Sequence, residues 1–291
     1  MKTIVSIITF ITASFLFSNP VNAQKDFQGK AYYFSKTPME LGRFGANMSE
    51  QRKKQIEARL KNRLEKTYIL TFNREESIYK EDEKLDAISG ATDSWGANFT
   101  PGPQYKNVKK NSFLQEQEFY GKQFLIKEDL KALGWKMGTE TKQIGNYTAF
   151  KATCKRPVFD TSWFNFSWEG NRNRDDNEKK SDSTETVDTA NLDAEPEEEV
   201  IEMITIEAWY TPTIPVSQGP GDYWGLPGLI LEVSVGNTTL LCSKIIMNPE
   251  EKIKIKELDK GKEVTKKEYK DIITEKMKEF RENRGRRRNR G

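Results

Sequence analysis

Ile204-Thr-Ile-Glu-Ala-Trp-Tyr-Thr211 and Leu229-Ile-Leu-Glu-Val-Ser-Val235 are the two halves of the stretch that decides the fold. In both halves apolar residues alternate with other residue types, which is the pattern of a β-strand with one buried face. Pro212 and Pro215 follow the first half, and proline ends a strand because it has no backbone N–H to donate. The sequence therefore predicts two strands of one sheet, joined by a loop rich in proline and glycine.

The loop ends in the string Gly225-Leu-Pro-Gly-Leu-Ile230, which carries a turn signal. Pro227 fixes φ at about −65°, and Gly228 accepts the positive φ that the third position of a type II turn requires. We therefore predict a type II turn over residues 226–229. Glycine permits the backbone path, and the core is filled by Leu226, Leu229 and Ile230. Gly236-Asn237 predicts a second turn, into a third strand.

The same six residues resemble the motif that names the GLPGLI family of secreted bacterial proteins. The similarity extends over roughly residues 65–250 and includes Ile214-Pro215, Gly219-Pro220 and Trp135-Lys136. The resemblance implies a secreted protein. It implies no particular activity, because the family has no assigned function.

The first 23 residues have the pattern of a signal peptide. Lys2 precedes the apolar run Ile4–Phe17, and Ala23 is a small residue suited to cleavage before Gln24. The run is shorter than a membrane-spanning helix requires, and no cysteine nearby could carry a lipid anchor. We therefore expect an exported protein, in the periplasm or at the cell surface, with no transmembrane segment in the mature chain.

Charge is balanced overall but segregated along the chain, with 47 Lys+Arg against 44 Asp+Glu. Residues 170–200 are acidic and almost free of apolar side chains, which predicts a disordered insertion within a β-rich domain of residues 24–260. Residues 261–291 are predicted to form a C-terminal helix and a basic disordered tail. The tail is either a solvated end or a site for an acidic surface, and export makes nucleic acid a poor partner.

Two helices are expected beside the strands. Ser49 can cap a helix over residues 50–66, and Thr265 with Glu268 has the spacing of a capping box at the start of a helix through about Phe280. Most other segments have strand-like patterns, Asn248–Lys256 among them. We therefore predict a mainly β (α+β) fold: a curved antiparallel sheet, for which a half-barrel is one form, with a helix in the N-terminal half and a C-terminal helix.

The residue types present exclude several chemistries. The chain has no histidine, which excludes Ser-His-Asp triads, Cys-His dyads and histidine-ligated zinc. Two cysteines, Cys154 and Cys242, are too few for a structural zinc site. In an oxidising compartment they could form a disulfide, and the alternative is two buried thiols on separate strands. We predict no metal and no cofactor.

The central stretch also holds the candidate catalytic carboxylates. Glu207, Asp222 and Glu232 lie on or beside the two strands, and a pair of carboxyl groups can serve as acid and base in a hydrolase. The alternation predicts instead that Glu207 and Glu232 point into water. We accordingly assign no catalytic residue.

Aromatic residues give a second hypothesis, of a binding site. A loop held by proline and glycine loses little entropy on binding, so it could present Asp222, Tyr223 and Trp224 to a ligand, with Trp209 beside it. The alternative is that Gly225–Ile230 is a structural turn only. We predict a non-enzymatic binding or assembly factor for an apolar ligand or an outer-envelope protein. Two other functions stay open, an exported carboxylate-dependent hydrolase and a structural component of an envelope assembly.

Overall fold

A computed structural model of the chain describes residues 27–38, 48–82, 101–158 and 203–288. These residues form twelve strands, whose bounds in chain order are β1 (Gln28–Lys36), β2 (Glu65–Asn73), β3 (Glu76–Glu81), β4 (Gln104–Asn107), β5 (Ser112–Phe119), β6 (Lys122–Asp129), β7 (Lys136–Ile144), β8 (Tyr147–Pro157), β9 (Met203–Thr211), β10 (Leu229–Val235), β11 (Thr238–Met247) and β12 (Lys262–Val264). They also form two helices, α3 (Glu50–Leu64) and α7 (Lys266–Arg288).

All twelve strands belong to one open sheet, in the order β12-β6-β5-β4-β3-β2-β1-β11-β10-β9-β8-β7. Among the described residues β12 pairs with β6 in parallel, and the other neighbours are antiparallel. The prediction of a mainly β fold with two helices is therefore confirmed. The signal-peptide residues 1–23 and the acidic tract 170–200 lie outside the described residues.

The two strands predicted from the central stretch are antiparallel neighbours, β9 and β10. Leu229 pairs with Thr211, and Val235 pairs with Ile206. β10 then turns into β11 at Gly236, which has a φ of 53°. Both the strand pair and the second turn are confirmed.

The turn predicted over residues 226–229 is not of type II. That turn needs a positive φ at Gly228, whereas the positive φ of 91° falls on Gly225. Gly228 is required for a different reason, because a Cβ at this position would overlap the carbonyl oxygen of Thr211. The close approach of the loop to the end of β9 therefore explains this glycine.

The sheet curves around the loop of residues 212–228, which we call the β9–β10 loop. In the sheet order β4 and β8 are seven strands apart, which is about 34 Å on a flat sheet. The loop nevertheless contacts both strands. Lys106 of β4 donates to the Tyr223 carbonyl at 2.9 Å, and Arg156 of β8 lies 2.9 Å from Asp222.

Side chains of the β9–β10 loop form part of the core. Ile214 and Val216 are buried in one cluster, together with Tyr33 and Leu70 from β1 and β2. Tyr223 and Leu226 belong to a second cluster, with residues of β8 and β9. Because the loop contributes to both clusters, it fills the concave side of the sheet.

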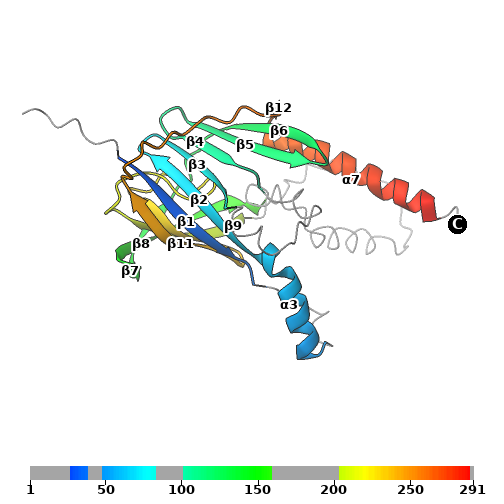
Figure 1. Cartoon of the computed structure of the whole chain (residues 1–291), viewed down its shortest axis with the longest axis horizontal. Coiled ribbons are helices and arrows are strands. Elements are labelled where there is room, and N and C mark those ends of the chain that lie inside the picture. Colours follow the sequence, from blue (N-terminus) through cyan, green and yellow to red (C-terminus); the bar gives the residue numbers. More distant parts are fainter. Residues whose placement is uncertain (1–26, 39–47, 83–100, 159–202, 289–291) are drawn as a thin grey trace, which may run out of the picture.

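The helix α7 packs on the same side of the sheet, at its β6 end. Tyr269 and Ile273 contact Phe119 and Phe124, and Figure 1 shows the C-terminal part of α7 extending beyond the sheet. The predicted capping box is confirmed, because the Thr265 backbone N–H donates to Glu268 at 2.7 Å and Glu268 N–H donates back to Thr265 Oγ1 at 3.2 Å. The helix ends at Arg288 rather than near Phe280, since lysine, arginine and glutamate are good helix formers and no proline interrupts them.

The helix α3 projects away from the sheet and leads directly into β2 (Figure 1). Ser49 caps it as predicted, because its side chain accepts a hydrogen bond from the Arg52 N–H at 3.3 Å. Neither helix is long and apolar enough to cross a membrane, as judged over the described residues.

The strand predicted over Asn248–Lys256 does not form. Residues 248–261 are irregular, and β12 takes the place beside β6. Ile255 and Leu258 pack on Tyr105, Leu114 and Leu125, which alternate with the residues that face α7. The apolar spacing of this segment therefore reflects packing on the other face of the sheet, without a hydrogen-bonded ladder.

Cys154 and Cys242 are both buried free thiols, so the structure agrees with the second of the two alternatives and not with the possible disulfide. β8 and β11 are three strands apart, about 14 Å, which exceeds the Cα separation that a disulfide can span. Burial raises the pKa of Cys154 to about 11 and that of Cys242 to about 12.

Candidate functional site

One row of cross-strand partners runs over six adjacent strands of the sheet. Each pair of neighbours in the row is directly opposite, so their side chains share one face. We call this set the sheet row, and it consists of Thr67 (β2), Phe34 (β1), Leu241 (β11), Glu232 (β10), Trp209 (β9) and Lys151 (β8). The row contains two of the residues singled out in the sequence, Trp209 and Glu232.

Trp209 has two lysines near its ring, Lys151 from the row and Lys142 from β7. Lys142 Nζ is 4.2 Å and Lys151 Nζ is 5.7 Å from the centroid of its ring, both within range of a cation–π interaction. The indole Nε1 donates to Glu207 at 2.9 Å. Trp209 is only 7% exposed and belongs to a buried apolar cluster, so its ring is not an open stacking surface.

Both carboxylates beside Trp209 are paired with lysines. Glu232 lies 2.8 Å from Lys142, and Glu207 lies 3.0 Å from Lys151. Burial acts to raise the pKa of Glu207, but hydrogen bonds from Lys151 and Trp209 outweigh it and hold that pKa below its ordinary value. A general acid at neutral pH needs a raised pKa, so Glu207 is poorly suited to that role.

Asp222 has a separate set of partners, on the β9–β10 loop. Its Oδ2 lies 2.9 Å from Arg156 and 3.5 Å from Lys266, at the start of α7. Burial acts to raise its pKa, but these two cations lower it to about 2. The ion pairs of Asp222 therefore involve none of the lysines that pair with Glu207 and Glu232.

Tyr223 and Trp224, the other two loop candidates, make contacts that hold the loop in place. Tyr223 is buried, and burial raises the pKa of its hydroxyl. Trp224 accepts a hydrogen bond at its carbonyl from Trp135 Nε1 at 2.7 Å, and its own Nε1 donates to the Lys131 carbonyl at 3.2 Å. These contacts support the interpretation that Gly225–Ile230 is a structural turn.

Lys106 is the residue of this region that sequence reasoning missed. Its side chain is buried, and Nζ donates to the carbonyls of Gly219 at 2.6 Å and Tyr223 at 2.9 Å. Burial lowers the pKa of Lys106 to about 7, against the opposing effect of Asp222. Nothing in the sequence distinguishes it from the many surface lysines, because its partners are backbone groups more than a hundred residues away.

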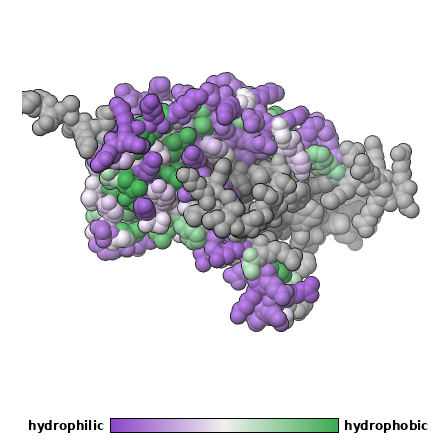
Figure 2. Space-filling model, in the orientation of Figure 1, coloured by the Kyte–Doolittle hydropathy of each residue, from purple (hydrophilic) through white to green (hydrophobic). Residues whose placement is uncertain are grey.

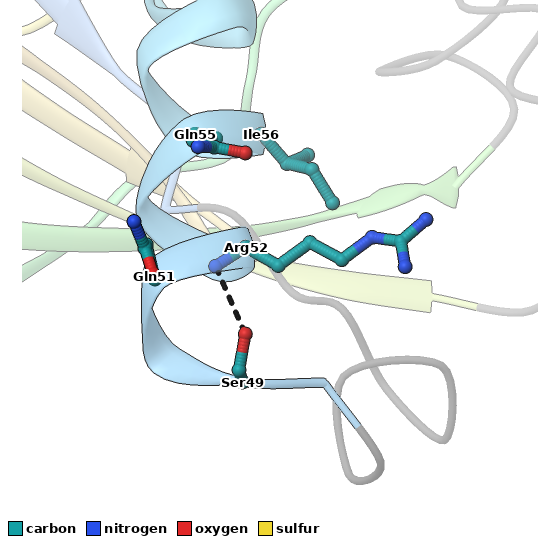
Figure 3. Close-up of a pocket in the computed structure, with 5 residues that line it drawn as sticks. All are labelled: Ser49, Gln51, Arg52, Gln55 and Ile56. Carbon is teal, nitrogen blue, oxygen red and sulfur yellow. Dashed lines mark hydrogen bonds between the residues drawn. The ribbon is translucent and has the colours of Figure 1, made fainter.

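A pocket beside the first turns of α3 offers no reactive pair of groups. In Figure 3 two of the lining residues are joined by the capping hydrogen bond, which the Arg52 N–H donates to the Ser49 side chain. Its lining residues are Ser49, Gln51, Arg52, Gln55 and Ile56. Across the part of the chain that is described, no group of three or more histidine, cysteine, aspartate or glutamate residues is placed to hold a metal ion.

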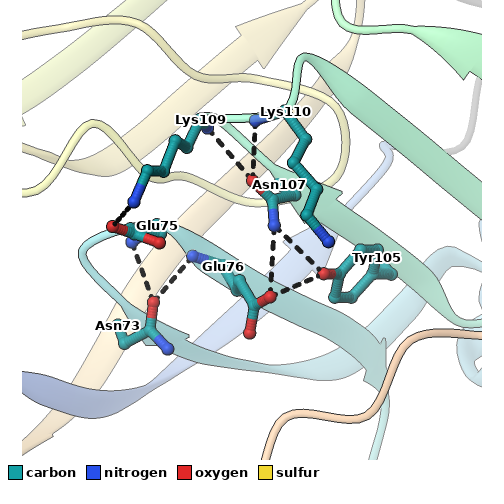
Figure 4. A network of polar contacts seen from close by, with 7 residues as sticks. All are labelled: Asn73, Glu75, Glu76, Tyr105, Asn107, Lys109 and Lys110. Atoms are coloured by element: carbon teal, nitrogen blue, oxygen red, sulfur yellow. Dashed lines mark hydrogen bonds and ion pairs between the residues drawn. The ribbon is translucent and has the colours of Figure 1, made fainter.

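A polar network elsewhere fixes two neighbouring turns (Figure 4). Glu76 accepts hydrogen bonds from the Tyr105 hydroxyl at 2.9 Å and from the Asn107 side chain at 3.1 Å. Asn73 accepts from the backbone N–H groups of Glu75 and Glu76. Burial raises the pKa of Tyr105 to about 12, so the phenol stays protonated and donates. We interpret the network as structural, because its hydrogen bonds close the first turn and join it to the residues beside the second.

Two solved structures of PNGF-II resemble the chain over most of its length. The form in the C2 space group has a TM-score of 0.45 at 15% identity, and the form in P21 has 0.44 at 16%. The match covers 85% of this chain but 32% and 33% of those chains, so the chain spans about a third of their length. A comparison with curated proteins finds no match.

A family model matches the part of the chain that contains the central stretch. The model is Porph_ging, described as a protein of unknown function, and it matches residues 135–232. This range begins at Trp135, just before β7, and includes the whole β9–β10 loop. Over these residues the chain therefore matches a GLPGLI-type family of unknown function, the type that its motif indicates.

Proposed function

We propose that the protein is an exported, non-enzymatic binding or assembly factor that recognises an envelope protein through the sheet row. Export rests on the signal-peptide pattern of residues 1–23. The observation that carries the proposed recognition is the sheet row itself, where an exposed apolar pair adjoins a charged cluster on one face.

The apolar pair is Phe34 and Leu241, which lie directly opposite each other on β1 and β11. Their exposed fractions are 37% and 39%, high for large apolar side chains. Figure 2 shows hydrophobic residues gathered over β1, β2 and β11, with hydrophilic residues around them. Apolar residues surrounded by polar ones are the usual composition of a protein–protein contact.

The charged half of the row suits recognition better than catalysis. Lys142 and Lys151 are fixed over Trp209 and paired with Glu232 and Glu207. Fixed pairs of opposite charge give specificity for a partner of complementary charge. A hydrolase would need one of these carboxyl groups protonated, which the lysines oppose.

The filled interior favours a protein partner over an apolar small molecule. A pocket for such a ligand encloses about 300–1,000 Å³. In the described residues the concave side of the sheet instead holds Ile214, Val216, Tyr223 and Leu226 of the β9–β10 loop, all buried. The sheet row is an extended surface on strands, which fits a protein.

Site-specific cross-linking tests this function. A photoreactive phenylalanine analogue replaces Phe34 in the bacterium that encodes the chain, and the matched control carries it at the exposed Lys254, on the irregular segment after β11. We expect one cross-linked product of defined mass at position 34 and none at position 254. Equal products at both positions, or none at either, would contradict the proposal.

A binding measurement with the captured protein completes the test. Leu241→Ser should weaken its affinity by about tenfold, since an apolar contact at an interface of this kind contributes on the order of 1.4 kcal/mol. Far-ultraviolet circular dichroism checks that the variant is folded. An unchanged affinity would show that the captured protein does not bind the sheet row.

A further inference from the structure

A second exposed surface lies where α7 passes the turn between β5 and β6. The rings of Tyr120 and Phe280 pack against each other, with centroids 4.9 Å apart. Both remain exposed, at 45% and 46%. Tyr120 is at the tip of the turn, where it has a φ of 48° and precedes Gly121 at 75°. Two large aromatic side chains therefore face solvent together at one end of the sheet.

The charge of α7 changes at this point. Residues 266–280 hold five lysines and four acidic residues, so this part of the helix is nearly neutral. Residues 281–288, which follow Phe280 directly, hold five arginines and one acidic residue. Figure 1 shows this end of the helix beyond the strands of the sheet. A strongly basic helix end thus begins next to the exposed aromatic pair.

We propose that Tyr120, Phe280 and residues 281–288 form a docking site for the surface of an anionic lipid bilayer. Arginines near a membrane are attracted by anionic headgroups, and aromatic side chains favour the boundary between headgroups and acyl chains. Binding of a helix to a bilayer surface strengthens with the apolar area that it buries and with its electrostatic attraction to anionic lipids, and this site offers both. The site is independent of the sheet row.

The aromatic pair is the reason to prefer a bilayer to nucleic acid or an acidic protein. An arginine-rich segment alone would attract any polyanion through charge. The half-exposed rings of Tyr120 and Phe280 lie next to that segment. At a bilayer surface they can be buried against hydrocarbon, and this apolar burial adds to the electrostatic attraction.

Flotation with lipid vesicles tests the proposal on the whole purified chain. The vesicles are phosphatidylcholine, with or without about a third of phosphatidylglycerol, in about 0.1 M salt, where the Debye length is about 10 Å. We expect binding to the anionic vesicles only, and its loss in about 1 M salt. Absence of binding to anionic vesicles would overturn the proposal.

Two variants and a control assign the binding to its residues. Replacing Arg284, Arg286, Arg287 and Arg288 with glutamine should lower the partition coefficient at least about tenfold, and Tyr120→Ser with Phe280→Ser should lower it several-fold. The control makes the same charge change at four exposed lysines elsewhere, which are Lys131, Lys155, Lys254 and Lys260. It should change the coefficient less than about twofold.

Three outcomes would contradict the assignment. An equal loss in the control would mean that net charge, and no particular site, drives binding. Unchanged binding in the aromatic variant, together with equally tight binding of a DNA oligonucleotide by the whole chain, would show a general polyanion site. Loss of the folded circular dichroism signal in the aromatic variant leaves the arginine variant as the deciding measurement, and its full binding would refute the site.

Discussion

Lys106 Nζ lies 2.9 Å from the carbonyl oxygen of Tyr223 and donates a hydrogen bond to it. Lys106 belongs to β4, and Tyr223 belongs to the loop between β9 and β10, on the other half of the sheet. This contact, with the Arg156–Asp222 ion pair, ties the loop to both halves. The GLPGLI-type motif therefore ends a segment that is part of the core.

Lys106→Met tests how strongly this contact holds the loop. At about pH 9.5 the lysine is neutral in the folded protein, and the substitution removes both of its hydrogen bonds. Two buried carbonyl groups then lack a donor, so the free energy of unfolding should fall by about 2 kcal/mol. Urea denaturation measures it. Lys110→Met, at an exposed lysine of the adjacent turn, should change stability by less than about 0.5 kcal/mol.

The difference in unfolding free energy between the unmutated protein and Lys106→Met should depend on pH. The pKa of Lys106 is about 7 in the folded protein, against the ordinary value of 10.5 in the unfolded chain. Between these values the unfolded chain binds more protons, so the stability of the unmutated protein rises with pH, by at most about 1.4 kcal/mol per unit. The variant lacks this dependence. Between about pH 9.5 and 7 the unmutated protein should lose about 3 kcal/mol, more than the deficit of about 2 kcal/mol, so the deficit of the variant should shrink and then reverse as the pH falls. A deficit that is constant or grows would refute the lowered pKa.

Gly228→Ala tests the reason given for the second glycine of the motif. An alanine Cβ would overlap the Thr211 carbonyl, so the loop or the end of β9 must move. We expect a loss of about 2–3 kcal/mol in the free energy of unfolding. Gly138→Ala in β7 is the matched control, because the nearest atom to its added Cβ is 3.4 Å away. A similar, small effect in both variants would mean that Gly228 serves chain flexibility alone.

Thiol labelling tests the state of the two cysteines. Both are buried and free, and their raised pKa values leave almost no thiolate at neutral pH. In the folded protein we expect less than one thiol to react with an alkylating reagent over the time in which a small thiol reacts fully. In denaturant without a reducing agent both should react, and a mass lower by two hydrogens would instead reveal a disulfide.

The parts of the fold that depend on local pattern could be predicted from the sequence. Alternation gave β9 and β10, and the spacing of Thr265 and Glu268 gave the start of α7. The same kind of pattern failed over residues 248–256, where apolar residues pack on a sheet face without strand pairing. Alternation reports which side is buried, and it does not report whether a neighbouring strand is present.

The candidate site could be predicted only in part. Trp209 was singled out as an aromatic residue on a predicted strand, but the lysines over its ring come from β7 and β8. The sheet row depends on the register of five strand pairs, and a shift of one residue in any of them would break it. Register between strands far apart in the sequence is set by tertiary packing. Local sequence therefore does not predict that Phe34 and Leu241 are partners.

Native-state hydrogen exchange tests most directly the claim that the β9–β10 loop is part of the core. The backbone N–H of Leu229 donates to Ile214 at 2.9 Å, and that of Ile230 donates to Gln218 at 3.0 Å, so both report on the loop. We predict that these two amides exchange only through global unfolding, with the same free energy as the amide of Ala208 in β9. The account would be contradicted if the loop amides exchanged through a local opening whose free energy is several kcal/mol below that of global unfolding, while the amide of Ala208 stayed protected.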